Sequence, residues 1–105
     1  GVATELIYTA RMIESQEALQ LHILNRLMPA KDLERETMTL ADQIAKGPPL
    51  ALRQSKINLY KGLEVDLDTA LALLASAQSQ LFMTDDFVEA TRAFQEKREP
   101  VFKGQ

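Results

Sequence analysis

The residues best suited to ligand chemistry lie near the end of the chain, where aromatic rings and cations alternate. Phe94 is followed one helical turn later by Lys97 and Arg98, and then by a second aromatic residue, Phe102, and a third cation. A flat apolar ring beside ammonium and guanidinium groups suits a ligand that carries a base and phosphates. The alternative is structural: the cations match the dipole of a helix end, and the ring anchors it. Composition alone favours the structural interpretation.

A second candidate is a basic run between residues 46 and 61, which contains cations and no acid: Lys46, Arg53, Lys56 and Lys61. Arg53 and Lys56 are three residues apart, so on a helix they are neighbours that can share an anionic ligand. The alternative is that the run pairs with the acidic residues at 64, 66 and 68, or is simply hydrated. We favour this alternative, because exposed ion pairs are common and weak.

Residues that catalyse acid–base or metal chemistry are few. His22 is the only histidine and has no partner at a metal-ligand spacing, so a structural or surface role is favoured. Asp85 and Asp86 are adjacent and point in different directions on a helix, so a helix cap is favoured over a catalytic pair. The acid pairs at 14/17 and 34/36 are interpreted as hydrated faces. We predict no catalytic residue and no metal site in this chain.

The composition is that of one small domain, with 105 residues, 46% hydrophobic residues and a net charge of −3. The negative charge argues against nucleic acid or an anionic membrane as the main partner. No apolar run is long enough for a membrane span. The chain has no cysteine, which excludes thiol chemistry and fits a reducing compartment, so we expect a cytoplasmic protein. Gly1 is not a natural start, and we expect a fragment or a processed product.

The hydrophobic pattern predicts an all-α fold of about six helices with little or no strand. The helices are expected at 2–9, 15–21, 30–46, 49–60, 66–83 and 84–97. Ser15, Asp66 and the residues 84–86 are expected to cap three of them, and Leu6 and Ile7 are expected to be buried. In the last helix the apolar face is expected to hold Phe87, Ala90, Thr91 and Phe94. Pro100 ends this region, so 101–105 is expected to be a tail.

The stretch from Asp66 to Met83 is the helix that most needs cover. Ala and Leu dominate it, and its apolar residues spread around most of the helix instead of forming one stripe. A helix that is apolar on most sides must be covered on most sides. In a chain this short, some of that cover could come from another chain.

Residues 93–104, which read AFQEKREPVFKG, resemble the AF-x-EKR-x-P-x-F-x-G ending of the enoyl-CoA hydratase/isomerase (crotonase) family. Three earlier stretches resemble the family in the same order. The first is ELIYTARMI at 5–13, and the second contains EAL and LNRLMP within 17–29. The third, within 40–56, contains LA, IA and GPP, followed by single matches at Ala51, Ser55 and Lys56. Each segment alone is weakly specific, but together they cover essentially the whole chain in register.

The resemblance implies that residues 1–105 are the C-terminal helical domain of such an enzyme. The N-terminal ββα spiral, with the oxyanion hole and the catalytic carboxylates, would lie upstream, and this chain alone would be inactive. It implies packing into homotrimers, often paired as hexamers, and an acyl-CoA substrate, with coenzyme A as part of the substrate and no other cofactor. Carried over by motif, Phe94 would pack near the adenine of a neighbouring subunit's CoA, and Lys97 would approach its phosphates.

The reaction that the resemblance implies for the parent is hydration of a 2-enoyl-CoA through a stabilised thioester enolate. One alternative is a non-catalytic assembly or CoA-binding module, and another is an isomerase or other reaction of the family. A further alternative is a stable monomeric helical domain, whose exposed apolar surface should be small.

Three positions depart from the family pattern, which usually has glycine at each: Ala10, His22 and Ala90. At the first two, glycine would permit a positive φ that Ala and His resist. We therefore expect the local turns at Ala10 and His22 to be affected.

Overall fold

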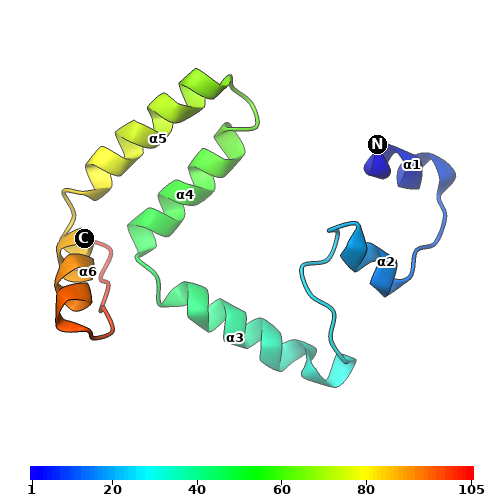
Figure 1. The fold of residues 1–105 in the computed structure, drawn as a ribbon, viewed down its shortest axis with the longest axis horizontal. Helices are drawn as coiled ribbons and strands as arrows, with labels where there is room; N and C mark the ends of the chain where they lie inside the picture. Colours follow the sequence, from blue (N-terminus) through cyan, green and yellow to red (C-terminus); the bar gives the residue numbers. More distant parts are fainter. The chain divides into compact units, whose positions relative to one another are not determined.

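The computed structural model describes residues 1–105 as six α-helices and one short 3₁₀ helix, with no strand (Figure 1). The all-α prediction with about six helices is therefore confirmed. The α-helices are α1 (Val2–Thr9), α2 (Ser15–Gln20), α3 (Leu33–Ala45), α4 (Pro49–Lys61), α5 (Leu67–Leu81) and α6 (Asp85–Glu96). The helix expected at 30–46 instead begins with a 3₁₀ turn at Ala30–Asp32, directly after Pro29. No helix is both long enough and apolar enough to cross a membrane.

The chain divides into two compact units, Gly1–Met38 and Thr39–Gln105, with the boundary inside α3. In the first unit, Arg11 links α1 to α2. Its guanidinium donates two hydrogen bonds to Glu17, at 3.2 and 2.7 Å, and one to Glu5, at 3.3 Å. These bonds lower the pKa of Glu17 below its ordinary value. Glu17 thus lies at the surface, as expected, and there it pairs with Arg11 from the irregular connection.

Two other expectations for the first unit are wrong. Ser15 is the first residue of α2 and not its N-cap: the cap position is Glu14, without a side-chain capping bond. Ile7 is 74% exposed, and Leu6 is only half-buried. The physical reason is length, since an eight-residue helix such as α1 covers little surface by itself.

Ala10 and His22 both have the left-handed backbone conformation, with φ of 47° and 58°. Ala10 ends α1, where its N–H donates to the carbonyl of Leu6 at 3.0 Å. His22 follows α2, and its N–H donates to the carbonyl of Leu19 at 3.1 Å. The two turns thus have the geometry that glycine tolerates but carry side chains that strain it, at a cost of about 1 kcal/mol each.

In the second unit, α4 and α5 form a helical hairpin and lie side by side (Figure 1). Asp66 caps α5, as predicted: its carboxylate accepts from the backbone N–H and the hydroxyl of Thr69, at 2.9 and 2.7 Å. In the connection, Lys61 pairs with Glu64 at 2.9 Å. The hairpin therefore has a defined turn as well as a helix–helix contact.

Very few apolar side chains are fully buried, and all of them are alanines: Ala18, Ala77 and Ala93. On α5 only Ala77 is buried, whereas Leu67, Leu71 and Leu74 are about half exposed or more, at 72%, 53% and 49%. This agrees with the expectation that α5 needs cover from outside its own hairpin. The exposed apolar surface is therefore not small, as the alternative of a stable monomeric domain requires it to be.

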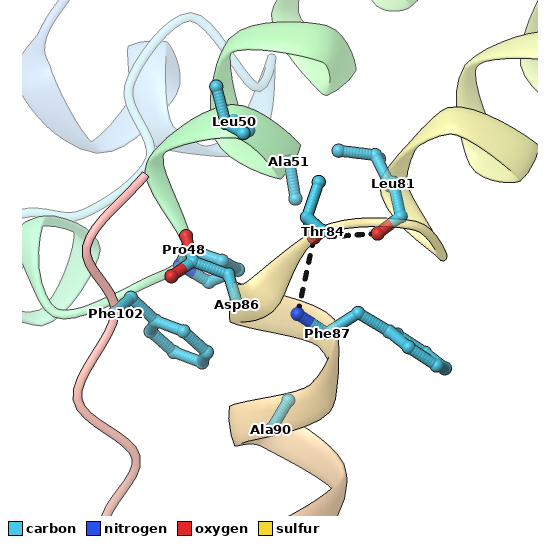
Figure 2. Close-up of a pocket in the computed structure, with 9 residues that line it drawn as sticks. All are labelled: Pro48, Leu50, Ala51, Leu81, Thr84, Asp86, Phe87, Ala90 and Phe102. Carbon is cyan, nitrogen blue, oxygen red and sulfur yellow. Dashed lines mark hydrogen bonds between the residues drawn. The ribbon is translucent and has the colours of Figure 1, made fainter. Parts of the chain in front are cut away.

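Thr84 joins the end of α5 to the start of α6. Its hydroxyl donates to the carbonyl of Leu81 at 2.7 Å and accepts from the backbone N–H of Phe87 at 3.2 Å, so it caps α6 as expected (Figure 2). The rings of Phe82 and Phe87 are in contact across the same corner, with their centroids 4.8 Å apart. These contacts set the direction in which α6 leaves the hairpin.

Candidate functional site

Phe94 and Lys97 lie at the C-terminal end of α6. Phe94 is in the last turn and is 86% exposed. Lys97 ends the helix in the left-handed conformation, with φ of 53° and ψ of 42°. The turn closes through two backbone bonds: the N–H of Arg98 donates to the carbonyl of Ala93 at 3.0 Å, and that of Lys97 to Phe94 at 3.3 Å. An exposed ring and an exposed ammonium group therefore flank one ordered turn.

The most buried side chains of α6 are not among the four that were expected to share its apolar face. Phe94 is exposed and Phe87 is 43% exposed, whereas Asp86 and Ala93 are buried, at 4% and 1% exposure. Asp86 and Ala93 are seven residues apart and therefore share a face of the helix. The residues after α6 fold back over that face, where the small Ala93 admits their backbone and acidic side chains accept their N–H groups. The prediction that 101–105 is a tail is wrong for this reason.

Glu89 makes the first of these attachments. Its carboxylate accepts two parallel hydrogen bonds from the guanidinium of Arg98, at 2.6 and 2.9 Å, and a third from the backbone N–H of Val101 at 2.9 Å. These donors, Arg98 first, lower the pKa of Glu89 to about 2. Arg98 also pairs with Glu96 at 2.5 Å, and both carboxylates raise its pKa. Bidentate Arg–carboxylate pairs of this kind hold both direction and distance.

Asp86 makes the second attachment. Its two carboxylate oxygens accept from the backbone N–H groups of Lys103 and Gly104, at 2.7 and 2.9 Å. Its own N–H donates to the carbonyl of Gln105 at 3.1 Å. Gly104 has φ of 75°, the region that glycine adopts without strain. The N-cap of α6 is thus Thr84 and not Asp86, which instead binds the backbone of the last residues.

A hollow of about 100 Å³ lies between α4, α6 and the returning segment (Figure 2). Its lining is mainly apolar and consists of Pro48, Leu50, Ala51, Leu81, Thr84, Asp86, Phe87, Ala90 and Phe102. Ligand pockets usually exceed roughly 300 Å³, so we interpret this hollow as a gap in packing.

The returning segment also packs against the turn before α4. A Cβ at Gly104 would lie 3.7 Å from side-chain atoms of Pro49. A larger hollow of about 510 Å³ also has Phe102 in its lining, together with Lys46 and Glu99. Two short motifs that are far apart in the sequence, GPP at 47–49 and PVFKG at 100–104, are therefore packed together.

Three cations of the basic run lie in different surroundings. Lys61 pairs with Glu64, as the structural alternative predicted, and this contact raises the pKa of Lys61. Lys46 lines the hollow beside the returning segment, whereas Arg53 lines a different one with Ala77 and Gln80. His22 lies in the first unit at a turn with positive φ, and its structural or surface role stays a prediction.

Sequence reasoning missed Asp86 and Glu89 as the residues that order the end of the chain. Both were visible as acids one turn apart on α6, followed by a segment with an exposed arginine and a glycine. The informative signal was the glycine after an aromatic residue, Phe102-Lys103-Gly104, which is typical of a turn and not of a free tail.

Comparison with known proteins places this fold in a family. The family model described as enoyl-CoA hydratase/isomerase matches residues 1–105. Among curated proteins, the short-chain-enoyl-CoA hydratase of Clostridium acetobutylicum is 36% identical over 98 residues, covering 93% of this chain and 38% of that protein. The mitochondrial methylglutaconyl-CoA hydratase of Mus musculus is 36% identical over 109 residues, covering 100% of this chain and 35% of that protein.

The crystal structure of an enoyl-CoA hydratase from Bacillus anthracis is similar throughout this chain, with a TM-score of 0.96 and 38% identity. The match covers 100% of this chain and 41% of that one. The chain thus spans about two fifths of the length of the relatives that it matches. Sequence, family model and fold agree over all the described residues, and the chain belongs to the enoyl-CoA hydratase/isomerase family.

Proposed function

We propose that residues 1–105 are the C-terminal helical domain of an acyl-CoA enzyme that hydrates 2-enoyl-CoA. In this proposal the chain supplies assembly contacts and one edge of the CoA site, and the catalytic groups lie upstream. The observation that carries it is the exposed Phe94 beside Lys97 on an ordered turn. The names of relatives in two bacteria and the mouse, all hydratases of CoA thioesters, support the reaction.

The chemistry of the two side chains suits opposite parts of coenzyme A. The face of an aromatic ring stacks on a base such as adenine, and an ammonium group binds phosphate oxygens. Phe94 and Lys97 are three residues apart, so the ring and the cation emerge from the same end of α6. We propose that both contact the CoA held by a neighbouring subunit, with no further cofactor.

Hydration of an enoyl thioester requires groups that this proposal places upstream. Backbone N–H groups would stabilise the enolate oxygen that develops on the thioester, while carboxylates activate water and return the proton. The contribution of residues 1–105 would be to bind the nucleotide part of the substrate. Binding energy from such a remote part of a substrate helps to position the reacting bond.

The reaction is tested with the protein as its gene encodes it. Hydration removes the conjugated double bond of a 2-enoyl-CoA, so the loss of its ultraviolet absorbance follows turnover directly. We expect turnover of at least one short- or medium-chain substrate. A protein that binds CoA but hydrates none of them would favour the alternative of a non-catalytic CoA-binding module, and an isomerase would instead move the double bond.

We also propose that the leucines of α5 are covered in a homotrimer, or in a hexamer built from trimers. Leu71 is 53% exposed within the chain. Replacing it by glutamate would place a charge in a buried contact, and this should shift the protein to smaller assemblies in sedimentation velocity. Ser76→Glu adds the same charge to a different face of α5 and serves as the control. Equal assembly of wild type and Leu71→Glu would contradict the proposal.

The cytoplasmic location stays a prediction.

A further inference from the structure

We propose that Glu89 is a positioning residue for Lys97: it holds the turn after α6 so that the ammonium group is presented to the phosphates of coenzyme A. This inference rests on the proposed function. Glu89 accepts hydrogen bonds from two residues that follow Lys97: from the side chain of Arg98 and from the backbone N–H of Val101. Lys97 itself lies between these attachments and the helix.

The conformation of Lys97 needs such support. Its φ of 53° lies in the left-handed region, which is strained for a residue that has a side chain and unstrained for glycine. The helix holds this turn from one side through two backbone bonds: the N–H of Lys97 donates to the carbonyl of Phe94, and the N–H of Arg98 donates to that of Ala93. On the other side the chain returns along α6, where the carboxylate of Glu89 accepts from the backbone N–H of Val101 at 2.9 Å.

Three hydrogen bonds converge on the Glu89 carboxylate. Two come from the planar guanidinium of Arg98, which sets its orientation as well as its distance, and one comes from the N–H of Val101. The Glu89 side chain is only 20% exposed, so water competes less for these bonds than at an open surface pair. Removing the charge on Glu89 therefore loosens the residues on both sides of position 99.

The two cations of the turn, Lys97 and Arg98, differ in whether they belong to these ion pairs. Arg98 pairs with both nearby carboxylates, Glu89 and Glu96, whereas the ammonium of Lys97 is in neither pair. An arginine can engage two carboxylates because its five donors form a fork, which lysine lacks. Glu89 thus neutralises Arg98 and leaves the charge of Lys97 for an anionic ligand.

The sign of the expected effect separates positioning from simple electrostatics. Coenzyme A is a polyanion, so removing a negative charge near its phosphates should by Coulomb's law strengthen binding. If Glu89 positions Lys97, the variant Glu89→Gln weakens binding instead. The matched control is Glu99→Gln, which removes the same charge from the same turn without breaking an ion pair, and which should leave affinity unchanged or slightly improved.

The experiment measures CoA binding by isothermal titration calorimetry, using the protein as its gene encodes it, in a double-mutant cycle. We expect Glu89→Gln to weaken binding by about threefold to fivefold and Lys97→Met by about tenfold. In the Lys97→Met background, Glu89→Gln should have no further effect, because it acts through that side chain. A purely structural role would weaken binding in both backgrounds.

Two results would overturn the inference while leaving the proposed function intact. In the first, Lys97→Met weakens CoA binding, but Glu89→Gln has the same CoA affinity as the Glu99→Gln control. In the second, Glu89→Gln weakens CoA binding by the same factor in the wild-type and the Lys97→Met backgrounds. A wild-type protein that binds no CoA, or a Lys97→Met variant with unchanged affinity, overturns the CoA role of Lys97 itself. If Glu89→Gln folds poorly, Arg98→Lys tests the same inference. This variant keeps the positive charge but loses the two parallel hydrogen bonds to Glu89. It should weaken CoA binding to the same extent as Glu89→Gln.

Discussion

The carboxylate of Asp86, in the first turn of α6, accepts a hydrogen bond from the backbone N–H of Gly104 at 2.9 Å. The adjacent N–H, that of Lys103, donates to the same carboxylate at 2.7 Å. Two successive backbone donors on one carboxylate form a small anion-binding concavity, here filled by a side chain of the same protein. The end of the chain is therefore built around a buried acid.

Replacing Asp86 should detach this end of the chain. Asp86→Ala leaves two partly buried N–H groups without an acceptor, and we expect the free energy of unfolding to fall by about 2 kcal/mol. Chemical denaturation of the two proteins measures the difference. Asp85→Asn is the control, because Asp85 is exposed and contributes only through the helix dipole. This variant should lower the free energy of unfolding by less than about 1 kcal/mol. Equal losses at both positions would contradict the anchoring role.

The Glu89–Arg98 attachment should persist in acid. Arg98 and the N–H of Val101 lower the pKa of Glu89 from 4.5 to about 2 in the folded protein. A lowered folded-state pKa means that the stabilisation is fully present above the unfolded value and is lost only as the pH falls from about 4.5 towards 2. The measurement is a carboxyl-carbon NMR titration of Glu89. A midpoint near 4.5, the ordinary value, would show that the pair does not form in solution.

Relief of backbone strain should stabilise the first unit. Ala10→Gly and His22→Gly place glycine where φ is positive, so each should raise the free energy of unfolding by up to about 1 kcal/mol. Thermal or urea unfolding measures this change. Ala3→Gly is the opposite control, since Ala3 lies inside α1, where glycine costs roughly 0.5–1 kcal/mol. Destabilisation at all three positions would mean that the left-handed turns are absent.

The ring of Phe94 should contribute to CoA affinity without contributing to the fold. It is 86% exposed within the chain, so Phe94→Ala should leave the helix content unchanged. Loss of stacking on a base is worth about 1–3 kcal/mol, so we expect CoA binding to weaken by roughly tenfold. Phe94→Tyr keeps the aromatic face and should bind CoA normally. Equal affinity in wild type and Phe94→Ala would remove this residue from the site.

Local signals in the sequence were sufficient for most of the fold. The Ala/Leu-rich run and its acidic first residue predicted α5 and the Asp66 cap, because both depend on residues within one or two turns. Gly47 and the two prolines after it likewise marked the break before α4. Ser15 shows the limit of such signals, since the chain entering α2 turns at Glu14 and leaves the serine inside the helix.

Contacts between distant residues could not be predicted in the same way. The bond from Val101 to Glu89 joins residues twelve apart, and that from Gly104 to Asp86 joins residues eighteen apart. Periodicity on α6 placed Phe87 and Phe94 on one face, whereas the returning backbone lies against acidic acceptors and the small residue Ala93. Family resemblance supplied Phe94 and Lys97 as site candidates, and that assignment still depends on the binding experiments.

The return of the last residues along α6 makes position 105 a convenient place for a probe. The carbonyl of Gln105 accepts from the N–H of Asp86, at the end of α6 opposite to Phe94 and Lys97. A helix of 12 residues is about 18 Å long. A fluorophore attached at residue 105 would therefore lie well away from the ligand surface, and its mobility would report when the final segment lifts from the helix.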